Sequence, residues 1–311
     1  MYNSHSSVSL LNNFPDFCAR DFNIDAYNNF FKTSNSIINA KASNIAYQEH
    51  WGCFSIKCAF GGEEFYQAQN RVYAVNDQNF LVLNEGQYYS SYIFSKKQVE
   101  SFTINFTSAF VQEVSDGCMH SDEQALDNPF CNSKINFEFV EKLYQHDNAV
   151  STILFIIKQL LKDFNANREK IAELYYQLME KLFLLHRGVI REINLIKACK
   201  PSTRKELYKR LHYAKDYIDS CIASEITLHD LSRIALMNAA YFLRQFHKHF
   251  HTTPYQYLML RRMKAAAEMM HNTRSTITDI CTAVGYEDVS SFTKLFKKHY
   301  GFSPEKYRNQ I

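Results

Sequence analysis

The chain has 311 residues, 46% of them hydrophobic, which excludes a wholly disordered protein and leaves room for two domains or three small ones. Its net charge of +3 at pH 7 is unevenly spread, because residues 205–311 hold 16 Lys+Arg against 10 Asp+Glu while the rest of the chain holds 19 against 22. A basic C-terminal third behind a mildly acidic front indicates that only the tail meets a polyanion such as nucleic acid.

The cysteines and the N-terminal residues bear on the cellular compartment. None of the eight cysteines belongs to a CxxC pair, so we expect ordinary thiols in a reducing environment. Residues 1–14 lack the basic and apolar regions of a signal peptide, and the chain has no run of about 18 apolar residues. The sequence therefore predicts a cytoplasmic protein with no membrane partner.

Residues up to about 110 favour short β-strands. Turn signals at residues 61–62, 76–77 and 84–86 separate the candidates. The candidate strands are Phe54–Phe60, which alternates between two faces, Arg71–Val75, Phe80–Leu83, Tyr88–Phe94 and Ser101–Phe106. Short strands with tight polar turns are typical of an antiparallel barrel or sandwich. A polar stretch follows, over residues 115–132.

Two helices are predicted next, over residues 151–164 and 168–196. In the second helix, apolar residues recur at steps of three and four, namely Ile171, Leu174, Leu178, Leu182, Leu185 and Val189. This stripe fits either a dimer seam or packing on the chain's own β-rich domain, and both interpretations stay open. Residues 200–203, which include Pro201, are the expected hinge.

The C-terminal third contains an internal repeat with a spacing of fifty residues. The series Phe242, Arg244, Phe246, Lys248 and Phe250 recurs as Phe292, Lys294, Phe296, Lys298 and Tyr300. Upstream, with a slip of one residue, Thr227–Leu231 matches Thr276–Ile280. The repeat indicates that one structural unit occurs twice.

Each copy of the repeat predicts a short helix, a tight turn and a second helix. Thr227 and Thr276 are suitable N-caps for the first helices, and Asn238 and Asp288 for the second ones. Gly285 can adopt the left-handed conformation that ends a helix sharply. The aromatic residues at four-residue steps must be buried, which leaves a basic face outside, and this is the helix-turn-helix arrangement.

Pro254 begins the helix that is predicted to join the two copies. Its apolar stripe consists of Met259, Met263, Ala266 and Met270. A continuous helix would hold the two copies at a fixed separation, and DNA presents successive major grooves on one face about every 34 Å. We therefore expect the second helix of each copy to enter one of two adjacent major grooves.

These residues resemble the DNA-binding domain of the AraC/XylS family. The second copy carries the family pattern at Ile280, Gly285–Tyr286, Asp288, Phe292, Phe296–Lys297, Tyr300–Gly301, Pro304 and Tyr307–Arg308, and the connector carries it at Tyr257–Leu258, Arg262–Met263, Ala266 and Met269–Met270. His251 stands where the first copy usually has Gly, so an altered turn is expected there. Ser232 and Cys281 replace a small Ala.

The resemblance implies which residues contact DNA. Base edges are expected to meet the exposed faces of the second helices, at Ala240, Leu243, Arg244, Val289, Ser290, Thr293 and Lys294. Phosphates are expected to bind Lys248, Lys297 and Lys298. For Arg244, bidentate contact with guanine and contact with a phosphate both remain open.

The resemblance also implies an α+β multidomain architecture. Residues 1–145 would form a cupin-like antiparallel β-barrel that acts as a sensor, residues 146–200 a helical dimerisation or linker segment, and residues 205–311 an all-α domain with two helix-turn-helix units. The implied function is sequence-specific regulation of transcription, more often activation, by a homodimer on double-stranded promoter DNA. RNA polymerase and an unidentified small-molecule or protein effector are further expected partners. The dimer contacts would come from the barrel or from helix 168–196.

Two other classes of protein compete with this interpretation. A cupin-type metalloenzyme with an appended DNA-binding domain needs several His and a Glu on neighbouring strands, whereas His50 is the one histidine between residues 40 and 110. Glu63 and Glu64 are expected to be a solvated pair on a turn. The sequence thus predicts no catalytic residue, no metal site and no cofactor. The second alternative, a non-specific DNA-organising protein, would bind DNA without sequence preference.

Overall fold

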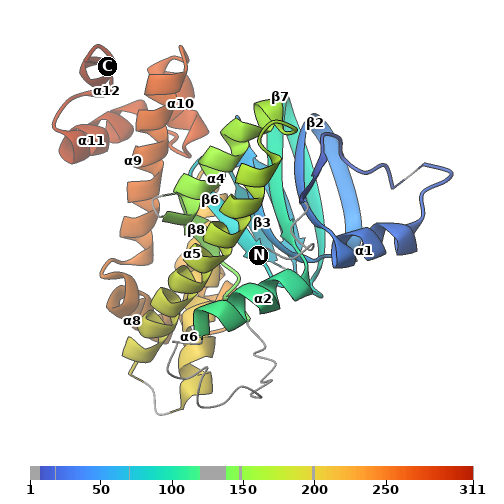
Figure 1. The fold of residues 1–311 in the computed structure, drawn as a ribbon. Coiled ribbons are helices and arrows are strands. Elements are labelled where there is room, and N and C mark those ends of the chain that lie inside the picture. Colours follow the sequence, from blue (N-terminus) through green and yellow to red (C-terminus); the bar gives the residue numbers. More distant parts are fainter. Residues whose placement is uncertain are drawn as a thin grey trace. The chain divides into compact units, whose positions relative to one another are not determined.

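The computed structural model describes residues 8–17, 19–69, 71–119, 138–146, 149–197 and 200–310. The chain divides into two compact units, Met1–Lys197 and Ala198–Ile311. The first unit combines a β-sheet with helices, whereas the described residues of the second form helices and their connections (Figure 1). Most of the polar stretch predicted at 115–132 lies outside the described residues.

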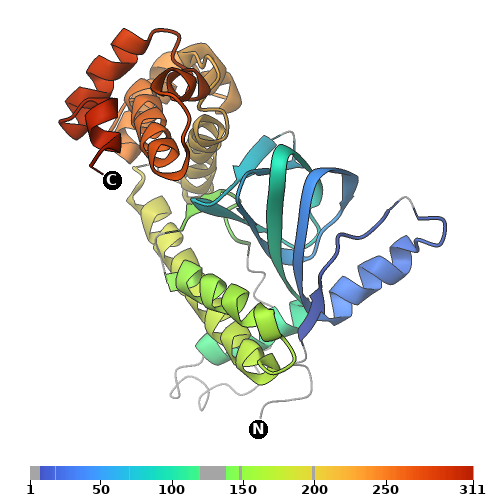
Figure 2. The ribbon, with the colours of Figure 1, turned by 90° about the horizontal axis from the view of Figure 1, so that it is seen from above.

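The described strands of the first unit form one eight-stranded sheet. The strands are β1 (Val8–Leu11), β2 (Asn35–Trp51), β3 (Phe54–Phe60), β4 (Glu64–Ala68), β5 (Arg71–Val75), β6 (Asn79–Leu83), β7 (Tyr88–Phe106) and β8 (Leu143–Gln145). Hydrogen-bonded neighbours follow the order β1-β2-β7-β3-β6-β8, and β4 pairs with both β5 and β7. Among the described strands, β1, β5 and β8 each pair with a single neighbour, so the sheet is curved but open (Figure 2), and the expected cupin-like antiparallel β-barrel is not confirmed.

The pairing of β1 with β2 is parallel, in a register that runs from Val8 opposite Asn35 to Leu11 opposite Ile38. The helix α1 (Ile24–Thr33) lies between these strands in the chain, and a connection of this length lets the chain return in the same direction. Neither strand was predicted. β2 is rich in Asn and Ala, which have low strand propensity, and it is held instead by pairing along most of its length with β7.

The predicted strands Tyr88–Phe94 and Ser101–Phe106 are parts of one strand, β7. Its first part pairs with β2 and β4, and its last part pairs with β2 and β3. Lys96–Gln98 between the two parts is exposed to solvent, and the strand continues through it. β3 is buried on both faces from Phe54 to Ala59, and it lies inside the sheet between β6 and β7.

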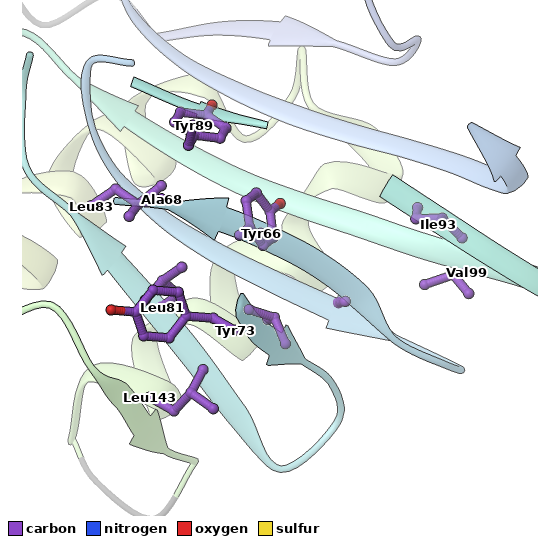
Figure 3. Close-up of a cluster of buried hydrophobic side chains, with 11 residues drawn as sticks. Tyr66, Ala68, Tyr73, Leu81, Leu83, Tyr89, Ile93, Val99 and Leu143 are labelled. Carbon is purple, nitrogen blue, oxygen red and sulfur yellow. The ribbon is translucent and has the colours of Figure 1, made fainter. Parts of the chain in front are cut away.

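The core of the first unit is an apolar cluster inside the curved sheet (Figure 3). It includes Tyr66 from β4, Tyr73 from β5 and Leu81 from β6. Glu64 shares the inward face of β4 with Tyr66 and is only 3% exposed. The expected solvated pair is therefore wrong for Glu64, since a two-residue period carries it to the inside of the sheet. Glu63 remains exposed.

The helices of the first unit are α1, α2 (Ser108–Met119), α4 (Ala149–Leu160), the 3-10 turn η1 (Leu161–Asp163) and α5 (Arg168–Leu195). In the stripe of α5, Ile171, Leu174 and Leu178 are buried, and α5 packs on α2, α4 and β1. Tyr175 on the same face donates a hydrogen bond to the carbonyl of Ser36 at 2.9 Å. This part of the stripe therefore packs on the chain's own β-rich unit, which favours the second of the two open interpretations.

The second unit contains α6 (Pro201–Ser220), α7 (Leu228–Ile234), α8 (Ala239–Phe250), α9 (Pro254–Asn272), α10 (Ile277–Ala283), α11 (Val289–Tyr300) and α12 (Pro304–Arg308). Figure 1 shows α8 at one end of α9 and the pair α10–α11 at the other. None of the helices that the structure describes is long and apolar enough to cross a membrane.

Candidate nucleic-acid interface

The first helix of each repeat is fixed by a capping box. In α7, Thr227 Oγ1 accepts a hydrogen bond from the backbone amide of Asp230 at 3.1 Å. Asp230 Oδ2 in turn accepts one from the backbone amide of Thr227, also at 3.1 Å. Thr276 and Asp279 form the same pair at the start of α10, at 3.1 and 3.2 Å. These hydrogen bonds from Thr227 and Thr276 lower the pKa of both aspartates. Both predicted N-caps are confirmed.

The second helix of each repeat is capped by the residue expected. Asn238 Oδ1 accepts the amide of Tyr241 at 2.8 Å, and Asp288 accepts the amides of Ser290 and Ser291 at 3.2 and 2.7 Å. Hydrogen bonds from the Ser291 and Ser290 positions lower the pKa of Asp288. A cap of this kind satisfies amides that the first turn of a helix leaves open, so each second helix begins at a defined residue.

Two phenylalanines in each second helix are wholly buried. Phe242 and Phe246 of α8, and Phe292 and Phe296 of α11, are 0% exposed. Phe250 and Tyr300 are partly buried, and each packs at a tilt against the preceding aromatic ring of its helix. The buried faces of α8 and α11 are thereby fixed, and the opposite faces are the ones available to a ligand.

The turns show how far the two repeats agree. Gly285 has φ of +86°, and Leu236, at the matching place in the first repeat, has φ of 52°. His251 after α8 has φ of 56°, and Gly301 after α11 has φ of 82°. The expectation that His251 alters its turn is wrong, because this residue adopts the same left-handed conformation that Gly301 adopts.

The structure places the predicted DNA-contacting residues on the outer faces, with two partial exceptions. The exposed ones are Ala240, Leu243, Arg244, Lys248, Ser290, Lys294, Lys297 and Lys298. Val289 is partly buried and packs against the apolar core of the second repeat, and Thr293 is also partly buried. The resemblance to the family pattern, from which Val289 was predicted to contact DNA, did not reveal that this residue lies at the border of the core.

Tyr241 was not predicted as part of this surface. Its side chain is 37% exposed, and the Arg244 guanidinium lies 6.0 Å from the centre of its ring. Residues three apart lie on the same side of a helix, and this spacing was the available signal. At this distance the Arg244 guanidinium lies within reach of a cation–π contact with the Tyr241 ring, so Tyr241 belongs to the same exposed surface as Arg244.

A buried cluster of charges joins α6 to α9. The carboxylate of Asp219 accepts hydrogen bonds from Lys215 Nζ at 2.8 Å and from the Tyr257 hydroxyl at 2.9 Å. It also forms an ion pair with Arg261, whose Nε lies 2.6 Å away. Burial by itself would lower the pKa of Lys215, but Asp219 and its neighbours raise it above its usual value, so the lysine stays charged. The first half of α9 is thus attached to the helix that precedes the first repeat.

The connector α9 begins at Pro254 behind a capping box formed by Thr253 and Gln256. Of its predicted apolar stripe, Met263, Ala266 and Met270 are buried, and Met259 is partly buried. The stripe packs on α10 and α11 of the second repeat. Two helix-turn-helix units joined by one helix define the class of domain that offers exposed helices to the grooves of DNA.

The comparisons with known proteins identify the family of this domain. A family model described as a helix-turn-helix domain matches residues 231–310. The HTH-type transcriptional regulator YdiP of Escherichia coli (strain K12) is 31% identical over 141 residues, which cover 45% of this chain and 42% of that protein. The lactose operon transcription activator of Staphylococcus xylosus is 30% identical over 101 residues, or 32% of this chain and 36% of that protein.

A similar solved structure is the C-terminal domain of AraT, a response regulator from Geobacillus stearothermophilus, with 27% sequence identity and a TM-score of 0.32, covering 33% of this chain and 85% of that chain. The chain spans less than half the length of the two curated relatives named above. Residues 231–310 match a helix-turn-helix family model, and the resemblance to AraC-type DNA-binding domains that was inferred from the sequence is confirmed.

Proposed function

We propose that this protein is a sequence-specific, DNA-binding regulator of transcription. The observation that carries the proposal is the repeated geometry of α8 and α11. Each helix begins at an N-cap side chain that accepts one or two hydrogen bonds from backbone amides. Each also has two fully buried phenylalanines and an exposed face with basic side chains. Regulation, and activation more than repression, is also what the names of the relatives support.

The proposed DNA contacts follow from which side chains of α8 and α11 are exposed to solvent. Arg244 and Lys294 are exposed on the outer faces of α8 and α11, together with Ala240, Leu243 and Ser290. These positions would read base edges, with Val289 and Thr293 at the border of the contact. Lys248, Lys297 and Lys298, in the last turns of the two helices, would hold phosphates and set the register of the protein on the duplex.

The first unit would act as a cupin-like sensor, and a group of polar side chains around a small cavity in it supports this role. A cavity of about 40 Å³ lies against β3, β4 and β7 and is lined by polar side chains that include Lys57, Glu64 and Tyr89. Lys57 Nζ donates a hydrogen bond to the Tyr89 hydroxyl at 2.8 Å. Burial lowers the pKa of Lys57 and raises that of Glu64. Buried charges are costly to a fold, and a cluster of them in a cavity is typical of a functional site.

A search with small molecules tests the sensor role. We expect a small organic acid or amine that binds beside Lys57 and Glu64 to raise the melting temperature of the full chain by several degrees. The Lys57→Met/Glu64→Gln variant is the matched control, because it keeps the approximate size of both side chains and removes their charges. A compound that stabilises both proteins equally binds elsewhere. If no compound from these classes distinguishes them, the sensor proposal fails.

The remaining partners form part of the same proposal. A homodimer would present two copies of the C-terminal unit to paired half-sites, and RNA polymerase would be contacted beside the promoter. Because Ile171, Leu174 and Leu178 are buried within the protomer, a dimer would use another surface of α5 or the sheet. Sedimentation of the full chain with and without a promoter fragment measures this stoichiometry.

The decisive experiment for the regulator is selection of binding sites. The full chain is incubated with random duplexes at about 0.15 M salt, and the bound fraction is sequenced over several rounds. A regulator enriches one motif, with specific binding on the order of a thousandfold or more tighter than non-specific binding. Binding without enrichment would instead identify a non-specific DNA-organising protein. Turnover of a substrate with a stoichiometric metal would support the metalloenzyme alternative.

A further inference from the structure

The loop between α6 and α7 is bound by a single buried arginine. Arg262, on α9, is 8% exposed. Its Nε donates to the carbonyl of Ile222 at 2.8 Å, and its Nη2 donates to the carbonyl of Ser224 at 2.8 Å. This loop leads directly to the N-cap of α7, so Arg262 holds the entry to the first helix-turn-helix unit.

The turn of the second unit lies against the same loop and the same arginine. A Cβ atom on Gly285 would lie 2.6 Å from the carbonyl oxygen of Ala223 and 2.8 Å from Arg262 Nη2. The ring of Tyr286 lies 5.4 Å from the Arg262 guanidinium, and the Tyr286 hydroxyl lies 3.0 Å from Met259 Sδ. The turn Gly285–Tyr286 therefore packs closely on the loop that begins the first unit.

We propose that Arg262 is a positioning residue that locks the second helix-turn-helix unit onto the first and so determines the spacing of DNA sub-sites that the protein accepts. This inference rests on the proposed function. The connector α9 joins the two units covalently, but a helix can bend, whereas the Arg262 contacts tie the turn of one unit to the loop of the other. Gly285 contributes to the same contact, because any larger residue would push the turn of the second unit away from the loop between α6 and α7.

Small rotations are enough for this device to affect recognition. The two reading helices must fit grooves about 34 Å apart, and a rotation of about 10° over such a length displaces one helix by about 6 Å. This displacement approaches two base-pair steps of about 3.4 Å. A fixed angle between the units therefore selects one sub-site separation, and a loose angle accepts several.

Two substitutions with one matched control test the proposal. Arg262→Met keeps most of the side-chain length and removes the donors. Gly285→Ala places a methyl group against Ala223 and Arg262. Gly301→Ala is the control, because Gly301 has φ of +82°, close to the +86° of Gly285, but no atom lies within 4 Å of the added Cβ. Backbone strain is thus nearly equal in the two alanine variants, and they differ in the contact between units.

Binding to spaced sites is the first readout. The full chain is measured on its selected site, on versions with the sub-sites moved by one or two base pairs, and on a fragment with one sub-site scrambled. We expect wild type and Gly301→Ala to lose at least tenfold in affinity when the spacing changes by one base pair. Arg262→Met and Gly285→Ala should lose about tenfold on the native spacing, vary less than about threefold across the spacings, and bind the single sub-site as wild type does.

The opposite pattern overturns the proposal. If both variants keep a sharp spacing profile, or lose single-site and two-site binding in parallel, Arg262 and Gly285 serve folding alone. A second readout does not depend on DNA: spin labels placed through non-natural amino acids at exposed His247 and Lys298 report the distance between α8 and α11. The distance distribution should broaden in Arg262→Met and Gly285→Ala but not in Gly301→Ala. A wild-type protein that selects no DNA site would refute the proposed function, while an unchanged distance distribution would refute this inference.

Discussion

His251 and Gly301 occupy equivalent positions after the second helices of the two repeats, and both have left-handed backbones, with φ of 56° and 82°. The side chain of a non-glycine residue makes this conformation unfavourable by about 1 kcal/mol or more. The first repeat therefore carries a strain that the second repeat avoids, although both turns are left-handed at this residue.

We predict that His251→Gly increases the free energy of unfolding of the C-terminal unit by about 1 kcal/mol, because glycine adopts this conformation without strain. Urea denaturation followed by circular dichroism measures the change. His247→Gly is the matched control, since His247 lies inside α8 on its exposed side and glycine there should cost about 1 kcal/mol. Equal effects of the two substitutions would show that the left-handed turn is not strained.

Removal of the buried carboxylate at the α6–α9 junction should be severe. Asp219→Asn removes the buried carboxylate that Lys215 and Arg261 share, and we expect a loss of about 3–5 kcal/mol. Glu206→Gln on the same helix is the control, because the ion pair of Glu206 with Arg210 is 2.7 Å long but lies at the surface. This variant should lose less than about 1 kcal/mol in the same denaturation experiment. A mild effect of Asp219→Asn would mean that the cluster is not needed for the fold.

The two kinds of proposed DNA contact should differ in their effect on specificity. Arg244→Ala should weaken the preferred site by about 1–3 kcal/mol and relax the preference at one base pair. Lys298→Ala should weaken all sites alike and reduce the slope of log affinity against log salt by about 1. Site selection and salt titration of the full chain measure both. An unchanged base preference in Arg244→Ala would assign Arg244 to a phosphate instead.

Acid should destabilise the first unit through His50. Burial lowers the pKa of His50 to about 4, opposed by its hydrogen bond with the Gln48 carbonyl and assisted by Lys57. An unfolded histidine titrates near 6.5, so between pH 6.5 and 4 the unfolded chain binds a proton that the folded chain does not. Stability from this group is therefore present above pH 6.5 and lost as the pH falls to 4, by at most about 3 kcal/mol.

The variant His50→Phe isolates this contribution. His50 lies among the rings of Phe17 and Tyr89, so phenylalanine can keep the packing while it removes the titration. We expect a shallower loss of stability between pH 6.5 and 4, measured as melting temperature against pH. His271→Phe, at an exposed position, should keep the wild-type slope. If both variants keep the wild-type slope, other groups cause the acid sensitivity.

Local patterns were enough to predict the helix-turn-helix units. The caps Thr227, Asn238, Thr276 and Asp288 act on amides two or three residues away, and the buried phenylalanines recur with the period of a helix. Such signals depend on neighbouring residues alone, so they can be read from the chain. The outward positions of Arg244 and Lys294 follow from the same period, since the buried face determines the exposed one.

Contacts between distant residues were decided by the tertiary structure. Glu64 is buried by the pairing of β4 with β5 and β7, and β2 is held by β7 although its own residues favour strands weakly. His251 is left-handed although a non-glycine residue disfavours this conformation. From the sequence, Arg262 is one residue of the family pattern in the connector, and only the fold shows that its guanidinium lies between a loop forty residues upstream and a turn over twenty residues downstream. The physical reason is that caps and periods act within a few residues, whereas pairing, burial and strain depend on which surfaces meet.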